Sequence, residues 1–193
     1  GYANMTGLTS GTLSSTEILT GTATTTYYRA EVKSGVCPSI YSEVASVQVD
    51  AATIAGTISS TSALICNGST PPTISLTGNT GTTIVWQTRS GVSSPTNIVP
   101  AQTGSSISSV INTSAPGSVQ VVNYYQALVR NGVCNILPTN EVAIAVDPTS
   151  QVGLIAAAQK VQQVCIGSPA TSIVLPTYVG TIQWQNSSSS GIG

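Results

Sequence analysis

Residues Tyr124–Cys134 read Tyr-Tyr-Gln-Ala-Leu-Val-Arg-Asn-Gly-Val-Cys, and residues Tyr27–Cys37 read Tyr-Tyr-Arg-Ala-Glu-Val-Lys-Ser-Gly-Val-Cys. The two stretches lie 97 residues apart (134 − 37). Two shorter phrases recur at offsets of 99 (165 − 66) and 98 (184 − 86): Ile65-Cys66-Asn67-Gly68-Ser69 returns as Val164-Cys165-Ile166-Gly167-Ser168, and Ile84-Val85-Trp86-Gln87 returns as Ile182-Gln183-Trp184-Gln185. A repetition of this period predicts an array of similar small domains.

The phase of the repetition predicts the domain organisation. Residues 51–147 hold one complete unit, residues 1–50 correspond to the second half of a unit, and residues 148–193 correspond to the first half of the next unit. Half of a β-sheet domain leaves strand edges unpaired and its core open. We therefore expect further sequence of a longer chain to complete both halves, with partner chains as the alternative.

The composition is typical of a strand-rich protein. Thr, Ser, Gly, Val and Ile dominate, Phe and His are absent, and only 6% of the residues are charged. β-Branched residues favour strands, and Gly, Pro, Asn and Ser favour turns. Five basic residues without a cluster, and a net charge of −1, argue against nucleic-acid binding. No apolar run is long enough to span a bilayer.

Short β-rich runs separated by turn residues predict an all-β unit. The predicted strands of the complete unit are residues 53–59, 73–77, 82–88, 105–112, 119–130 and 141–147. Asn131-Gly132, which follows the longest of these strands, is a favoured type I′ hairpin sequence. Strands at this spacing, without helical periodicity, indicate a β-sandwich.

Comparison of the two long strands separates a core face from an outer face. Side chains alternate between faces along a strand. The positions of Tyr125, Ala127 and Val129 keep aromatic or apolar residues in both copies, whereas the positions between them change. We therefore expect four aromatic core anchors: Tyr28, Tyr125, Trp86 and Trp184. Tyr27 and Tyr124 fall on the outer face and are the candidates for surface binding.

The last predicted strand leads directly into the next unit in both copies. Matching Val44 with Val142 makes Glu43 equivalent to Glu141 and requires a one-residue adjustment in the loop after the cysteine. The units then end in Asp50-Ala51-Ala52 and Asp147-Pro148-Thr149, which leaves almost no linker. Adjacent units are therefore expected to stack end to end as a semi-rigid rod.

The four cysteines occupy two phases of the repetition. Cys66 and Cys165 come early in a unit, and Cys37 and Cys134 come late. One disulfide per unit predicts the pair Cys66–Cys134, with Cys37 and Cys165 paired outside this segment; buried free thiols are the alternative. Such a bond would stabilise the unit by roughly 4 kcal/mol in the chain-entropy model, and it would place the protein in an oxidising compartment.

Catalysis and cofactor binding have little support in the sequence. Without histidine or C-x-x-C spacing we expect no metal site, and we expect no other cofactor. The six acidic residues form no close pair of the kind that glycoside hydrolysis needs, so we expect no enzyme activity. Asp50 and Asp147 lie at junctions, where calcium binds in many extracellular proteins, but so few carboxylates favour plain turn residues.

Two resemblances follow from these motifs. The order Cys…Trp…Cys with a tyrosine-rich late strand resembles the immunoglobulin-like sandwich, although Tyr125 lies nine residues before Cys134 (134 − 125), unlike antibody domains. The phrases at residues 27–39 and 181–185 resemble the repeats of giant Bacteroidota cell-surface adhesins, among them gliding-motility proteins of the SprB type that the type IX secretion system exports. The resemblance implies tandem immunoglobulin-like repeats in a long extracellular filament on the bacterial cell surface.

The leading functional hypothesis is a structural stalk segment of such a secreted adhesin, supporting surface attachment or gliding. Its expected partners are neighbouring repeats of the same chain, extracellular glycans or surfaces, and the secretion or motility machinery. One alternative is a carbohydrate-binding module of a secreted multidomain protein, in which Tyr27 and Tyr124 would stack on sugars. Another is a pilus-like polymer whose open halves are completed between chains.

Overall fold

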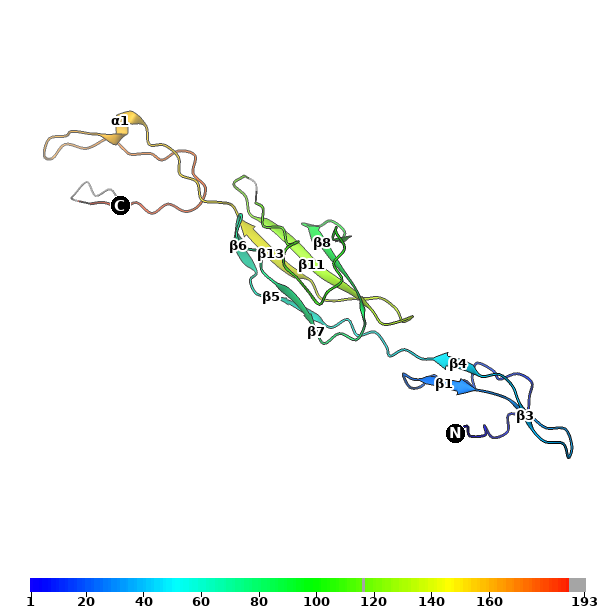
Figure 1. The fold of residues 1–193 in the computed structure, drawn as a ribbon. Coiled ribbons are helices and arrows are strands. Elements are labelled where there is room, and N and C mark those ends of the chain that lie inside the picture. Colours follow the sequence, from blue (N-terminus) through cyan, green and yellow to red (C-terminus); the bar gives the residue numbers. More distant parts are fainter. Residues whose placement is uncertain (116, 188–193) are drawn as a thin grey trace.

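The computed structural model describes residues 1–115 and 117–187. Three segments follow one another along the molecule: the N-terminal segment (residues 1–50), the central body (residues 51–147) and the C-terminal segment (residues 148–187) (Figure 1). Almost all of the regular secondary structure in the described residues is β-strand; the helix α1 (Ala157–Lys160) is a single short turn. The all-β prediction is confirmed.

The central body consists of two sheets. Its strands are β5 (Thr57–Ser60), β6 (Leu64–Cys66), β7 (Ile74–Thr77), β8 (Thr83–Ser90), β9 (Thr96–Asn97), β10 (Ser106–Ile107), β11 (Val121–Arg130), β12 (Leu137–Pro138) and β13 (Val142–Asp147). One sheet has the order β10-β7-β5. The other has the order β6-β13-β11-β8-β9, with β12 paired to β11. The arrangement is compatible with an immunoglobulin-like β-sandwich.

Both sheets contribute to one hydrophobic core. Ile58 and Ile74 come from the smaller sheet, and Trp86, Tyr125 and Ile144 come from the larger one. Trp86 is fully buried, and its indole N–H donates a hydrogen bond of 2.8 Å to the carbonyl of Gly104. A buried indole needs such a partner because an unpaired donor inside a core is costly.

The long strand β11 has the alternation expected of a strand with one buried face. Tyr125, Ala127 and Val129 are buried, whereas the residues between them are half-buried on the opposite face. Because β11 pairs on one side with β8 and on the other with β13, it forms the centre of the larger sheet.

The start of the central body contributes to both sheets. β5 pairs with β7 in the smaller sheet, and β6 then pairs in parallel with β13 in the larger one. Asn140, in the loop before β13, joins the two sheets at another point: its Oδ1 accepts the Ile58 N–H at 2.9 Å and its Nδ2 donates to the Ile58 carbonyl at 3.0 Å. Sequence analysis did not predict β6, β9 or β12.

The N-terminal segment has the same strand register as the second half of the central body. Its strands are β1 (Thr25–Tyr28), β2 (Glu31–Val32), β3 (Ile40–Tyr41) and β4 (Ala45–Gln48). Tyr28 pairs with Ala45 as Tyr125 pairs with Val142, and Val32 pairs with Ile40 as Val129 pairs with Leu137. Every one of these positions differs by 97 residues (125 − 28 and 137 − 40, for example).

This register corrects one detail of the sequence comparison. Ala45, rather than Val44, is equivalent to Val142, and Val44, rather than Glu43, is equivalent to Glu141. The loop after the cysteine therefore has the same length in both copies and needs no adjustment. Pattern matching failed here because Val44 resembles Val142 more closely than Ala45 does.

The C-terminal segment reproduces contacts from the start of the central body. Gln151 and Val179 form an isolated antiparallel bridge, as Ile54 and Thr80 do. The offset is 97 residues at the first partner (151 − 54) and 99 at the second (179 − 80). The two additional residues precede Cys165, in the interval that contains α1.

The two terminal segments contain no fully buried residue among those described. Trp184 is 53% exposed, although its sequence equivalent Trp86 is buried, and Val32 is 57% exposed, although its equivalent Val129 is buried. Tyr28 is half-buried. Trp184 and Tyr28, both expected as core anchors, thus lack the enclosure of Trp86 and Tyr125. In the described residues, Tyr28 lies in a two-stranded sheet that no second sheet covers, and Trp184 lies in no strand.

Candidate functional site at the junction around Asp50

The junction between the N-terminal segment and the central body is built around Asp50, just after β4. One carboxylate oxygen of Asp50 accepts the backbone N–H of Val133 at 3.0 Å. The other accepts the side-chain amide of Gln48 at 2.9 Å. Asp50 therefore connects the end of β4 to the turn that follows β11, across the boundary between the two segments.

The Asn131-Gly132 turn holds the connecting chain on its other side. Asn131 donates its backbone N–H to Thr53 Oγ1 at 3.0 Å and its side-chain Nδ2 to the Ala51 carbonyl at 2.8 Å. Gly132 has a φ of 48°, and a β carbon built there would lie only 1.8 Å from Asp50 Oδ2. Glycine therefore supplies both the left-handed backbone and the space for the carboxylate.

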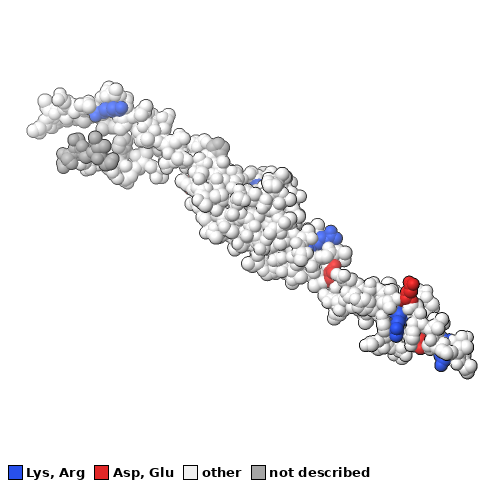
Figure 2. Space-filling model, viewed as in Figure 1, with Lys and Arg blue, Asp and Glu red and all other residues white. Residues whose placement is uncertain are grey.

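The hydrogen bonds at the junction affect the ionisation of Asp50. The Val133 N–H, and secondarily the Gln48 amide, hold the pKa of Asp50 below its ordinary value, because both stabilise the charged carboxylate. Charged side chains occur near this junction and along the N-terminal segment, whereas the visible face of the central body is nearly uncharged (Figure 2). The junction thus carries an ionised carboxylate, whereas few charged side chains occur on the face of the central body seen in this view.

The opposite end of the central body has related contacts at Asp147. Asn67 donates its backbone N–H to the Asp147 carbonyl at 2.8 Å and its Nδ2 to Thr149 Oγ1 at 3.1 Å. Gln120 donates to the Asp147 carboxylate at 2.7 Å. The sequence predicted plain turn residues at Asp50 and Asp147 and a hairpin at Asn131-Gly132. It did not predict that Asn131 and Asn67 bind across the two junctions, although Asn-Gly follows a strand at both places.

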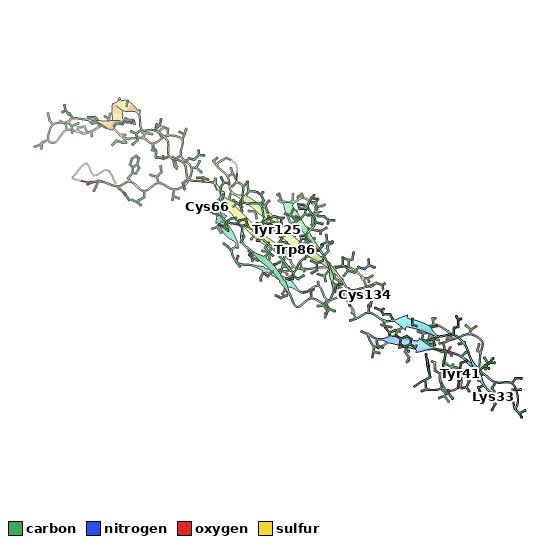
Figure 3. All side chains as sticks on the ribbon, in the orientation of Figure 1. Lys33, Tyr41, Cys66, Trp86, Tyr125 and Cys134 are labelled. Atoms are coloured by element: carbon green, nitrogen blue, oxygen red, sulfur yellow. The ribbon has the colours of Figure 1, made fainter. Side chains whose placement is uncertain are left out.

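The cysteines do not form the predicted pair. Cys66 and Cys134 lie at opposite ends of the central body, with Trp86 and Tyr125 between them (Figure 3). The strands explain the separation: Cys66 is beside Asp147 at the end of β13, whereas Cys134 follows the far end of β11. All four cysteines, including Cys37 and Cys165, are free thiols in this structure.

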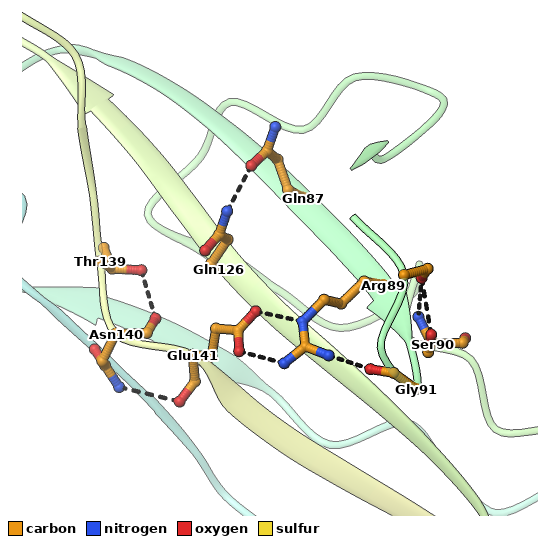
Figure 4. A network of polar contacts seen from close by, with 9 residues as sticks. Gln87, Arg89, Ser90, Gly91, Gln126, Thr139, Asn140 and Glu141 are labelled. Carbon is orange, nitrogen blue, oxygen red and sulfur yellow. Dashed lines mark hydrogen bonds and ion pairs between the residues drawn. The ribbon is translucent and has the colours of Figure 1, made fainter. Parts of the chain in front are cut away.

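The two outer tyrosines have different surroundings. Tyr27 is 58% exposed. Tyr124 is half-buried, and the Arg89 guanidinium lies 3.9 Å from the centre of its ring. Arg89 also donates two hydrogen bonds, of 2.6 and 2.5 Å, to the Glu141 carboxylate (Figure 4). An intramolecular cation therefore occupies a face of Tyr124 that a sugar ring would need.

The Arg89–Glu141 pair perturbs both of its members. The hydrogen bond from Arg89 lowers the pKa of Glu141, and the same bond raises the pKa of the Arg89 guanidinium. The pair links β8 to the start of β13 over the outer face of β11. The Glu141 carboxylate is thus already bound by a cation of the same chain.

A shallow hollow of about 360 Å³ lies beside the end of β8, bounded in part by Arg89, Asn123 and Tyr125. Asn123 is buried, and its Oδ1 accepts the Ser90 hydroxyl at 2.8 Å. Its Nδ2 has no hydrogen-bond partner within the described residues. Burial raises the pKa of Tyr125, whose hydroxyl accepts the Asn112 N–H. Asn123, a polar residue at a core-facing position of β11, was the sequence feature that could have indicated this hollow.

The described residues contain no group of three or more His, Cys, Asp or Glu residues that could hold a metal ion. None of their helices is long and apolar enough to cross a membrane.

The fold and the junction define an all-β chain in which a β-rich body is joined directly to the strands before it. The chain belongs to the family described as Domain of unknown function (DUF8696), whose model matches residues 1–51 and 54–148. The two matched stretches meet at the Asp50 junction. No curated protein and no solved structure matched the chain.

Proposed function

We propose that this chain is a structural stalk segment of a long secreted adhesin filament on a bacterial cell surface, supporting attachment or gliding. In this proposal, immunoglobulin-like bodies of 97–99 residues are stacked end to end, and residues 51–147 are one complete body. The family description assigns no function. Support comes from the repeated register, the junction contacts and the exposed apolar positions of the terminal segments.

The repeated strand register is the observation that carries the proposal. The N-terminal segment pairs its strands as the central body does, at a constant offset of 97 residues (142 − 45). Side-chain contacts recur as well: the Ser42 hydroxyl accepts the Ala30 N–H at 2.9 Å, and the Thr139 hydroxyl accepts the Ala127 N–H at 3.0 Å. Such agreement favours two copies of one structural unit in succession.

The exposure of equivalent residues supports an array that extends in both directions. Val32 and Trp184 occupy positions whose equivalents, Val129 and Trp86, are buried in the central body. In an array, the missing sheet of each terminal unit would cover these side chains. In such a linear array each body would contact only its neighbours.

The junction favours a stiff connection. The chain passes from β4 to the central body without a flexible linker, and Asp50 and Asn131 bind across the boundary. A connection with direct hydrogen bonds restricts bending more than a Gly/Ser-rich linker does. Stiff junctions of this kind would let a chain of bodies extend away from a cell surface.

Filament geometry can be tested with chains that carry additional copies of residues 51–147 after Asp147. Small-angle X-ray scattering should give a maximum dimension that grows by the same increment for each copy. Bodies joined by flexible junctions would instead give a maximum dimension that grows more slowly than the copy number. This result would contradict a stiff, rod-like arrangement.

Location and role can be tested in the source cells. Antibodies against the central body should label intact, unpermeabilised cells, and deletion of the gene should reduce surface attachment or gliding. A control antibody against a cytoplasmic protein should label only permeabilised cells. Labelling of the target only after permeabilisation would overturn the proposal.

A further inference from the structure

We propose that the cysteines form disulfides between successive bodies rather than within one body. Each bond would join the early cysteine of one body, equivalent to Cys66, to the late cysteine of the next body, equivalent to Cys134. This inference rests on the stacked array proposed above. Each body has one early and one late cysteine, which lie too far apart to bond to each other because they are at opposite ends of the body. Bonds between successive bodies would give both cysteines a partner.

The late cysteine, Cys134, lies at the start of the central body. The Cys134 thiol is 3.3 Å from the Ala51 carbonyl oxygen, to which it donates, and 3.9 Å from the Asp50 carbonyl oxygen. Cys134 is half-buried in this contact. The late cysteine of a body therefore lies at the boundary, against the first residue of its own body, Ala51, and the last residue of the body before it, Asp50.

The early cysteine, Cys66, lies at the other end of the same body. Cys66 is the register partner of Asp147 in the parallel pair of β6 with β13. The next residue, Asn67, donates its N–H to the Asp147 carbonyl at 2.8 Å. Cys66 itself is exposed, so its thiol is accessible to a group on the following body. The early cysteine thus lies beside the last strand residue of its own body.

The two positions coincide when the equivalence of the copies is applied. Asp50 is equivalent to Asp147 at the constant offset of 97 (147 − 50). An early cysteine in the preceding body would therefore flank Asp50, and Cys134 contacts the same residue from the other side of the junction. A disulfide spans about 4.4–6.8 Å between its α carbons, which suits two cysteines converging on one backbone residue.

The residues of the terminal segments agree with this arrangement. Residues 1–50 contain a late cysteine, Cys37, and residues 148–193 contain an early one, Cys165. In the proposed array, the partners of Cys66 and Cys134 likewise belong to neighbouring bodies. All four thiols are free in this structure.

Bond formation requires an oxidant of the disulfide class. The two thiols lose two protons and two electrons as the Sγ–Sγ bond forms, and the oxidant's disulfide is reduced to two thiols. An oxidising extracellular or periplasmic setting supplies such chemistry. The product would fix each junction covalently, beside the Asp50–Val133 hydrogen bond.

The test uses the full chain with a second copy of residues 51–147 inserted after Asp147. One variant keeps only Cys66 of the first copy and Cys134 of the second, with every other cysteine changed to serine. A matched control keeps only Cys134 of the first copy and Cys66 of the second. A third variant keeps both cysteines of the first copy. Each is oxidised with oxidised glutathione, and free thiols are counted by maleimide labelling and mass spectrometry under denaturing, non-reducing conditions.

We expect the first variant to lose nearly all of its free thiol by internal linkage, whereas the control and the third variant keep theirs. Retention of both thiols in the first variant, with circular dichroism showing a folded chain, would overturn the disulfide. Linkage in the third variant would also overturn it in favour of a bond within one body. Small-angle scattering of the first variant separates the two proposals: a rod-like particle without linkage contradicts the disulfide alone, and a bent or flexible particle contradicts the stacking as well.

Discussion

The indole of Trp86 fills space between the two sheets of the central body and donates its N–H to the Gly104 carbonyl at 2.8 Å. Trp184 has the same sequence context in the C-terminal segment, yet it is exposed. The residue type alone therefore does not determine burial. What differs is the surroundings of the ring: Trp86 lies in β8, paired with β11 and packed in the core between the two sheets, whereas Trp184 lies in no strand of the described residues.

Replacement of Trp86 with alanine should remove one of the largest side chains of the core. We expect Trp86→Ala to lower the free energy of unfolding by about 3–5 kcal/mol, because large-to-small core substitutions lose burial and leave a cavity. Urea denaturation followed by circular dichroism measures the loss. Trp184→Ala is the matched control and should change the value by less than about 0.5 kcal/mol; equal losses in the two variants would contradict this account of the core.

The contacts of Asp50 predict a pH-dependent junction. The pKa of Asp50 is lowered in the folded chain, so its ionised form stabilises the junction above the unfolded-state pKa, and this contribution is lost as the pH falls through the folded-state pKa. The Val133 amide resonance should shift over this acidic range in nuclear magnetic resonance titrations. Asp50→Asn should abolish the shift, and a titration that persists in this variant would assign it to another group.

At the scale of elements, Asn140 replaces a strand pairing. Its side chain bonds both the N–H and the carbonyl of Ile58 in β5, as a neighbouring strand would. The loop before β13 thereby attaches to the edge of the smaller sheet. An amide side chain can do this because it carries an acceptor and a donor side by side.

Asn140→Ala should leave both Ile58 groups without their partner. We expect the free energy of unfolding to fall by about 1 kcal/mol, a typical net value for such hydrogen bonds when water has partial access. Hydrogen exchange at the Ile58 amide should become faster. Asn135→Ala, at an exposed position of the loop after β11, should leave both measurements unchanged, and unchanged exchange at Ile58 in Asn140→Ala would contradict the role of this contact.

The elements also show where sequence reasoning succeeds and where it stops. The alternation of the long strand could be read because copies of one strand could be compared, and β11 has the expected buried and outer faces. β6 was missed because it has three residues and gains its order from the parallel pairing with β13. The repetition showed which cysteines are early and late in a unit, but it could not show how far apart they lie in space. The strands place Cys66 and Cys134 at opposite ends of the body, so the predicted pair does not form.

At the scale of the whole molecule, the buried core belongs to the central body alone. All residues of the core cluster lie between Ile58 and Ile144. The terminal segments contribute paired strands but no fully buried described residue. The central body therefore has what it needs to fold independently of the sequence on either side.

A fragment of residues 51–147 should fold cooperatively by itself. Its sole tryptophan, Trp86, should show the blue-shifted fluorescence of a buried indole, which moves to longer wavelength on unfolding in urea. Residues 1–50 are the comparison and should show no cooperative transition. Emission from Trp86 like that of an indole in water would mean that the body needs its neighbours to fold.

The parallel pairing of β6 and β13 determines how a body would respond to mechanical tension. The chain enters the body at one end and leaves from β13 at the other, so a pull along the molecule draws the two strands in opposite directions along their length (Figure 1). Their hydrogen bonds, including Ala145 N–H to Ala63 and Asn67 N–H to Asp147, both 2.8 Å, would be loaded together in shear rather than opened one after another. Each body would therefore resist stretching through the pairing of β6 with its last strand, β13. A tether made of such bodies would transmit force to its anchor before any of them unfolded.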